Sequence, residues 1–176
     1  MKRFAKLALA FLAFFLSGAA NAYTLKSAEG RFSIEFPAAP QAKHFRDVGT
    51  CMNDRYEFHL SQGRKAWFAG YQDCPHGYIE DYGPNQFARD AWKGIVHNLQ
   101  GELRENKLIK NHGMLGRQFL ILVTHAGRYR LGEARVFRVQ VFVDGDRVYK
   151  LMYRGPVPTH QDPDVEAFFA SFRVMR

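Results

Sequence analysis

The chain has 176 residues, of which 47% are hydrophobic and 15% aromatic, and its formal net charge is +8. A chain of this length can bury a substantial core as one domain. The basic residues are scattered, and their densest group is Arg128, Arg130, Arg135 and Arg138 around Glu133. A nucleic-acid-binding protein needs a coherent basic face, so we expect no nucleic-acid partner.

Residues 1–22 predict a signal peptide. Basic residues precede an unbroken apolar run over Leu7–Leu16, and the small residues Ala20 and Ala22 predict cleavage after the second of them. The run is too short to span about 30 Å of hydrocarbon, and no cysteine follows it for lipid attachment. We therefore expect a periplasmic or secreted protein without a membrane anchor, with one domain over residues 23–176. That domain keeps 22 basic and 17 acidic residues, a net charge of +5.

Strand patterns open the mature chain. We expect strands at Tyr23–Ser27 and Ala42–Val48 on either side of a third at Arg31–Phe36. In that middle segment phenylalanine and isoleucine alternate with polar residues. Pro37 ends it, because proline cannot donate to a sheet ladder.

Two cysteines, Cys51 and Cys74, flank a predicted hairpin. Its strands are Arg55–Ser61 and Arg64–Gln72. A two-residue turn between them, at Gln62-Gly63, places the two thiols opposite each other at the open end of the hairpin. In an exported protein this arrangement predicts a structural disulfide, worth roughly 3 kcal/mol in the chain-entropy model.

A loop and a helix follow the hairpin. Residues 73–84 form a loop by composition, and Asn85 can cap a helix that we expect to run to about Glu105. Apolar residues four apart form one stripe along this helix: Phe87, Ala91, Ile95, Leu99 and Leu103.

Three strand patterns come next, at Lys107–His112, Arg117–His125 and Leu131–Val143. A fourth, Arg147–Arg154, leads to a last helix. That helix begins at Asp162-Pro163-Asp164 with a cap, a first-turn proline and an acid at the positive end of the helix dipole. The order of strands, helix, strands and helix predicts an α+β domain with helices packed on an antiparallel sheet.

The register of the last strand pair decides which side chains share a face. A three-residue loop at Asp144–Asp146 places the apolar residues of both strands on one face, whereas a two-residue loop mixes them. Burial therefore selects the longer loop. The other face then carries Arg138, Lys150 and Arg154, a candidate basic face for an acidic headgroup or a glycan.

Several of these segments resemble the PsbP-like superfamily, which includes DcrB-like bacterial envelope proteins. The resemblance lies in residues 30–37 with Pro40, in the central helix, in the strand Arg147–Leu151 and in the closing residues 165–172. It implies a PsbP-like α/β/α sandwich over most of the mature chain. The superfamily is a scaffold with varied, mostly non-catalytic roles, so the resemblance implies a fold and no particular activity.

Cys74 and His76 are the alternative candidate metal ligands, because thiolate and imidazole bind zinc or copper. A disulfide would consume the thiol, and no paired-ligand motif supports the site, so we expect no metal and no cofactor. A Cys–His nucleophile also needs a free thiolate, and no serine lies in a Gly-x-Ser-x-Gly turn. The sequence therefore favours a protein that is not an enzyme.

The loop over residues 73–84 is the remaining candidate site. Tyr78, Ile79 and Tyr82 belong to no predicted helix or strand face that would bury them, so we expect a recognition surface. We predict a non-enzymatic, exported accessory or stress-linked envelope protein that binds an unidentified envelope protein or ligand through this loop. Two alternatives stay open: a metal-binding protein, and a carrier of a small hydrophobic ligand in a cavity between sheet and helix.

Overall fold

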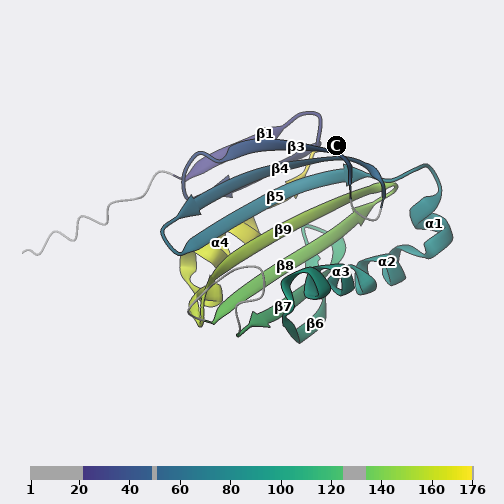
Figure 1. The fold of residues 1–176 in the computed structure, drawn as a ribbon. Coiled ribbons are helices and arrows are strands. Elements are labelled where there is room, and N and C mark those ends of the chain that lie inside the picture. The colour runs from purple at the N-terminus through teal and green to yellow at the C-terminus, as the bar shows by residue number, and fades with distance from the viewer. Residues whose placement is uncertain (1–21, 49–50, 125–133, 176) are drawn as a thin grey trace, which may run out of the picture.

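The computed structural model describes residues 22–48, 51–124 and 134–175, and within them ten strands form two antiparallel sheets (Figure 1). The larger sheet consists of β3 (Gln41–Val48), β4 (Asn53–Gln62), β5 (Lys65–Asp73), β6 (Glu102–Asn111), β7 (Met114–Val123), β8 (Arg135–Asp144) and β9 (Arg147–Pro156). Their order across the sheet is β3-β4-β5-β9-β8-β7-β6. Tight turns join β4 to β5, β6 to β7 and β8 to β9, so the two strands of each hairpin are adjacent in the sheet. The chain leaves the sheet after β5 and returns at the far edge with β6.

A smaller sheet and the last helix cover one face of the large sheet, which we term the α4 side. The smaller sheet consists of β1 (Tyr23–Ser27), β2 (Phe32–Phe36) and β10 (Arg173–Val174). Helix α4 (Pro163–Ser171) follows the short helix η1 (Thr159–Gln161) and packs against β2. These layers meet the large sheet in an aromatic core: Phe32, Phe36, Trp67, Phe142, Tyr149, Tyr153 and Phe168. Its rings pack edge to face, as at Phe36 and Phe168, whose centroids are 5.1 Å apart.

Three short helices lie on the opposite face, which we term the α3 side (Figure 1). They are α1 (Tyr78–Tyr82), α2 (Pro84–Asp90) and α3 (Trp92–Leu99). Apolar residues of α3 pack against buried side chains of β7 and β8: Trp92, Ile95, Val96 and Leu99 against Phe119, Ile121, Val139 and Val141. The predicted α+β fold, with helices packed on an antiparallel sheet, is confirmed.

The first two strands and the last helix follow the sequence pattern closely. β1 has the predicted bounds, and β2 covers the alternating segment that ends before Pro37. Helix α4 begins at Pro163 after Asp162. The Asp162 side chain does not cap the helix but lies 2.8 Å from Lys65 Nζ, so it ties α4 to the start of β5.

The central helix is shorter than predicted. Two helices, α2 and α3, replace it, and α3 ends at Leu99, after which Gln100 takes a left-handed conformation (φ 51°). Leu103, which the stripe places on the helix, lies in β6 opposite Ile121 of β7. Gly101 explains the early end: a Cβ there would come within 2.7 Å of Ile121 Cγ2, so the chain can approach the sheet this closely only at glycine.

The β4–β5 hairpin turns one residue later than predicted. Gly63 is the first of two turn residues, at φ 56°, and Gln62 pairs with Lys65. Glycine suits this position because a two-residue hairpin turn needs positive φ there. The change moves each cross-strand pair by two residues, but it leaves the same side chains on each face.

The β8–β9 hairpin contradicts the predicted three-residue loop. Gly145, at φ 60°, and Asp146 form a two-residue turn. The segment after β5 holds this turn in place, because Cys74 N donates to Asp146 O at 2.7 Å and Gly77 N donates to Asp146 Oδ1 at 3.2 Å. Burial does not select the longer loop, because both faces of the sheet are covered and β8 buries side chains on both of them.

Some predicted features lie outside the described residues. They are the leader up to Asn21, the basic residues Arg128 and Arg130, and parts of the strands predicted at Arg117–His125 and Leu131–Val143. In the part of the chain that the structure describes, no helix is both long enough and apolar enough to cross a membrane.

Candidate functional site

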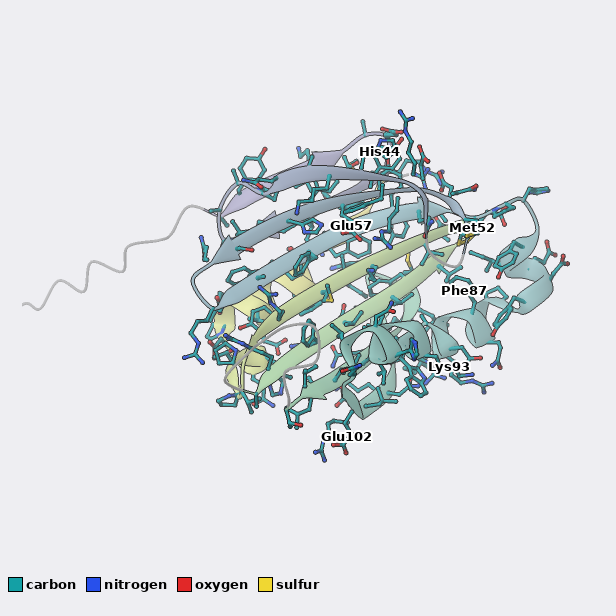
Figure 2. The ribbon with its side chains drawn as sticks, in the orientation of Figure 1. His44, Met52, Glu57, Phe87, Lys93 and Glu102 are labelled. Carbon is teal, nitrogen blue, oxygen red and sulfur yellow. A yellow bond between two sulfur atoms is a disulfide. The ribbon has the colours of Figure 1, made fainter. Side chains whose placement is uncertain are left out.

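A cavity of about 280 Å³ lies between the helices of the α3 side and the middle of the large sheet. Its apolar lining comes from both walls: Phe68, Phe87, Ile95, Val141, Val148 and Met152. Figure 2 shows the sheet wall with Glu57 and the helical wall with Phe87 on the same side of the molecule. Small-molecule sites typically measure about 300–1,000 Å³, so this cavity suits a small ligand.

Small residues on both walls keep this space open. On α3, Gly94 lines the cavity, and a Cβ there would meet no atom within 4 Å. On β5, Gly70 lies between Glu57 of β4 and Lys150 of β9 in the strand register. A Cβ at Gly70 would lie 2.4 Å from the Tyr56 carbonyl oxygen, so only glycine fits. Its missing side chain lets Glu57 extend over β5 toward Lys150.

Four ionisable side chains, Arg55, Glu57, His59 and Lys150, form what we term the charged floor. The Glu57 carboxylate lies 2.8 Å from Arg55 Nε and 2.6 Å from His59 Nε2. Only 11% of the Glu57 side chain is exposed. Lys150 Nζ lies 3.9 Å from the same carboxylate, which is too long for a hydrogen bond. The floor therefore sets two cations against one carboxylate that is already engaged by its neighbours.

Burial and charge shift the pKa of two groups in the floor. Burial alone would raise the pKa of Glu57, but the hydrogen bond from His59 and the charges of Lys150 and Arg55 outweigh it and lower that pKa. Burial lowers the pKa of Lys150, an effect that Glu57 opposes and Arg55 reinforces. Because Lys150 faces the cavity, 31% of its side chain stays accessible. Its ammonium group is thus poorly hydrated and yet open to a ligand.

The helical wall carries one carboxylate, Asp90, whose charge is already matched. Tyr82 donates its hydroxyl to Asp90 at 3.2 Å, and the Gln86 amide donates to the same carboxylate. Lys93 Nζ lies 3.2 Å away on the outer side of α3. The Gln86 hydrogen bond is the main cause of the lowered pKa of Asp90. The unmatched positive charge therefore belongs to the sheet wall.

Cys51 and Cys74 form a disulfide, with their Cα atoms 4.6 Å apart. Both residues are buried beside Ile79 and Phe87 in a small cluster at the edge of the cavity. The bridge joins the segments before β4 and after β5, so the predicted pairing of the cysteines forms although the hairpin register is shifted by two residues, and it anchors α1 beside them. A disulfide is compatible with an oxidising, extracytoplasmic compartment.

The alternative metal ligands Cys74 and His76 are engaged elsewhere. The disulfide removes the thiolate of Cys74. His76 Nδ1 lies 3.0 Å from Asp146 Oδ2 in the β8–β9 turn. Over the described ranges, no three His, Cys, Asp or Glu side chains gather as a metal site.

The predicted recognition loop contains the helix α1, and this changes the role of one residue. Tyr78 and Tyr82 are 36% and 46% exposed. Ile79 is only 1% exposed, so the prediction that it belongs to an exposed surface is wrong. One helical turn points Ile79 inward against Cys51 and Cys74, which composition alone did not indicate.

The predicted basic face of Arg138, Lys150 and Arg154 is wrong. Lys150 lines the cavity on the α3 side, and Arg154 follows it on the same face of β9. Arg138 lies on the α4 side, where it contacts Phe169. The shorter β8–β9 turn is the cause, because a one-residue change in register reverses the face of one strand relative to its partner.

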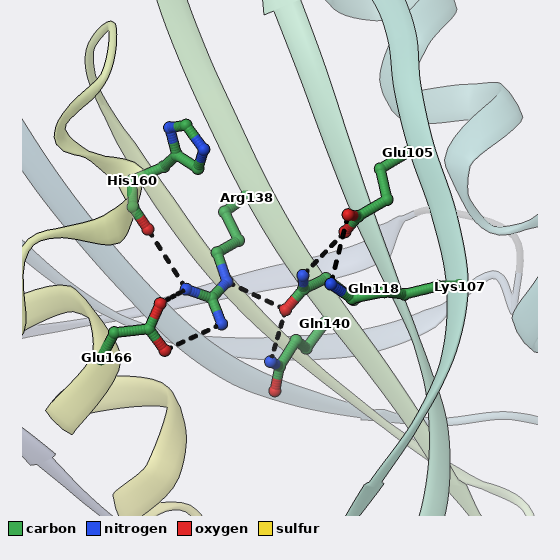
Figure 3. Close-up of polar contacts among 7 residues, drawn as sticks. All are labelled: Glu105, Lys107, Gln118, Arg138, Gln140, His160 and Glu166. Carbon is green, nitrogen blue, oxygen red and sulfur yellow. Dashed lines mark hydrogen bonds and ion pairs between the residues drawn. The ribbon is translucent and has the colours of Figure 1, made fainter.

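Arg138 instead joins a polar network that fastens α4 and η1 to the sheet (Figure 3). Its guanidinium donates to Gln118 Oε1 at 2.9 Å, to His160 O at 3.2 Å and to the Glu166 carboxylate. It also lies 4.6 Å from the centre of the Phe169 ring. These partners occupy the side chain, so we assign Arg138 a structural role.

The sequence analysis missed Arg55 and Glu57 as site residues, although a signal was present. In β4, Arg55, Glu57 and His59 alternate with apolar residues, which places all three on one face. Alternation of this kind usually marks a solvated face. Its meaning changes here because helices cover part of that face and enclose the charges.

Comparisons with known proteins identify the fold. No family model matches the chain, and no curated protein matches it. Among solved structures, the cyanobacterial PsbP (CyanoP) of Synechocystis sp. PCC 6803 is similar at a TM-score of 0.62 and 11% identity, covering 90% of this chain and 95% of its own. A Pseudomonas aeruginosa protein of unknown function is similar at a TM-score of 0.50 and 14% identity, covering 88% and 97%. The chain therefore has the PsbP-like α+β fold, as the resemblance implied, and at these identities the likeness carries no function.

Proposed function

We propose that the protein is a non-enzymatic, exported accessory protein that binds a small ligand in the cavity of the α3 side. One observation carries the proposal: aromatic side chains fill the α4 side of the sheet, whereas the α3 side leaves about 280 Å³ open above the charged floor. This favours the ligand carrier among the alternatives that the sequence left open. Apolar walls with a few convergent polar groups are typical of small-molecule sites.

The chemistry of the floor supports binding over catalysis. A general base works best when its pKa lies near the working pH. The pKa of Glu57 is lowered, and both Arg55 and His59 engage its carboxylate. Such a carboxylate is a weak base that holds its neighbours in position.

Export is supported by two independent features. The pattern of residues 1–22 is typical of a signal peptide. The Cys51–Cys74 disulfide fits the oxidising compartment to which such a leader directs a protein.

A cavity-filling variant tests the binding function. N-phenyl-1-naphthylamine, a neutral apolar dye whose fluorescence increases in apolar sites, serves as the probe. We expect saturable binding to the wild type, and Gly94→Leu should weaken it at least about tenfold because the new side chain enters open space. Gly94→Ala is the matched control: like Gly94→Leu it raises helix propensity, but it does not fill the cavity, and it should keep the affinity. Absence of saturable dye binding, or equal binding by Gly94→Leu, would refute the proposal.

A protein partner at α1 is a second candidate function, favoured by the exposure of Tyr78 and Tyr82. Tyr82 also lines the cavity, so a partner at this rim would lie beside the ligand. A variant that combines Tyr78→Ala with Tyr82→Ala should then recover fewer partners from periplasmic extract than the wild type. Equal recovery would remove this candidate.

A further inference from the structure

The charged floor has one more cation than its own carboxylate can satisfy. Arg55 lies 2.8 Å from one oxygen of Glu57, and His59 lies 2.6 Å from the other. Lys150 is left at 3.9 Å, beyond hydrogen-bond distance. The ammonium group is partly shielded from water and lies too far from Glu57 for a hydrogen bond, so an anion at this position would stabilise it.

No second carboxylate of the described cavity lining is free to supply that anion. Asp90 lies on the helical wall and is matched by Lys93, Gln86 and Tyr82. Besides Glu57 and Asp90, the described lining holds no acidic side chain, and polar residues such as Asn98 are uncharged. An anion that pairs closely with Lys150 would therefore come from outside the described cavity lining.

The number of unpaired positive charges in the charged floor indicates the charge of the ligand. Two cations, Arg55 and Lys150, face one carboxylate, Glu57, which leaves a single uncompensated positive charge. A carboxylate carries one negative charge at neutral pH, whereas a phosphate monoester carries about −1.5 to −2. The floor thus matches a carboxylate better than a phosphate.

The walls above Lys150 are apolar. Phe68 and Met152 belong to the row of side chains next to it on the sheet, and Phe87 and Ile95 line the cavity from the helices. A group that enters far enough to reach Lys150 would therefore leave the rest of its molecule against hydrocarbon and aromatic surface.

Building on the proposed binding function, we infer that the ligand is a small amphipathic carboxylate. Its carboxylate accepts from Lys150 at the charged floor, and its apolar body lies between Phe68, Ile95 and Met152. Burial of the apolar body supplies most of the affinity, and the ammonium group selects the charge.

Displacement of the bound dye by four eight-carbon probes tests this inference. The probes are octanoate, 1-octanol, octylammonium and octyl phosphate, which share one apolar body and differ in charge. We expect octanoate to displace the dye at a concentration about tenfold or more below that of 1-octanol, in line with a charge-assisted hydrogen bond. Octyl phosphate should bind more weakly than octanoate, and octylammonium most weakly.

Lys150→Met separates the role of the charge from that of the cavity. Methionine keeps the length and apolar stem of lysine, so the variant should bind the dye and 1-octanol as the wild type does but lose the preference for octanoate. Lys43→Met is the matched control, because Lys43 lies in the same row of the sheet, opposite Glu57 on β3, and outside the cavity lining. It should retain the preference.

The two proposals fail in different ways. If the wild type binds the dye but octanoate competes no better than 1-octanol, or if Lys150→Met keeps the preference, the inference is wrong and the binding function stands. A preference for octyl phosphate over octanoate would also overturn it. If the wild type does not bind the dye, the proposed function itself fails.

Discussion

The two sides of the large sheet are built from the same strands, but side chains fill the α4 side, whereas the α3 side contains a cavity. On β9, Tyr149, Leu151 and Tyr153 point to the α4 side and are fully buried. Val148, Lys150 and Met152 alternate with them, point to the α3 side and line the cavity. One strand therefore contributes to a closed aromatic core and to an open site at once.

The difference between the two sides lies in the residues that the covering layer brings. Helix α4 brings Val165, Phe168 and Phe169, which are buried against the sheet. Along the cavity, Gly94 of α3 and Ala91 just before it are too small to reach the opposite wall, and Ile95 is the large apolar residue that α3 adds to the lining. The α4 side is thus filled with side chains, whereas the α3 side leaves the cavity open.

Truncation of one phenylalanine on each side should give the largest contrast. Phe168→Ala should lower the free energy of unfolding by about 4 kcal/mol, because it leaves a cavity in a filled aromatic core. Phe68→Ala should cost about 1–2 kcal/mol, since Phe68 is half-buried and already borders open space. Urea denaturation of both variants measures this contrast. Equal losses would show that the α3 side is packed as tightly as the α4 side.

Loss of the disulfide should loosen the α3 side first. Cys51→Ser combined with Cys74→Ser should lower the free energy of unfolding by about 3 kcal/mol. Hydrogen exchange should accelerate at α1, which packs on the bridge, before it changes at α4. Simultaneous opening of α1 and α4 would contradict the independence of the two sides.

Disruption of the polar network on the α4 side should lower the free energy of unfolding by a smaller amount. Arg138→Met should cost about 2 kcal/mol, because Gln118 loses a charged donor and α4 loses its link to the sheet. Arg154→Met, on the opposite face of the sheet, should change stability by no more than about 0.5 kcal/mol. Thermal unfolding of both variants measures whether Arg138 contributes more to stability than Arg154.

The smallest expected effect is a pH dependence of the stability that Glu57 contributes on the α3 side. Because the folded-state pKa of Glu57 is lower than its ordinary value of 4.5, its contribution to stability is fully present above that pH. The contribution is lost as the pH falls below 4.5 and through the folded-state value. The difference in unfolding free energy between the wild type and Glu57→Gln should therefore shrink in acid. A constant difference from pH 7 to pH 3 would exclude this role for Glu57.

The sequence predicts the parts of the site that depend on local patterns, but it does not predict the charged floor. The disulfide and the exposure of Tyr78 and Tyr82 follow from local signals, namely cysteine spacing and loop composition. Arg55, Glu57 and Lys150 are brought together across three strands, with Gly70 between them. Cross-strand neighbours depend on register and strand order, which local pattern does not specify.

By itself the sequence determined the positions of most strands, the start of α4 and the pairing of the two cysteines. These features depend on interactions between near neighbours: alternation along a strand, the proline and acids at a helix start, and a tight hairpin. Only the tertiary structure decided the β8–β9 register, the separation of Arg138 from Lys150 and the cavity. The physical reason is that both faces of the large sheet are covered. A strand buried on both faces has no single apolar face to select its register, and the space left beside Gly94 exists only once the layers are stacked.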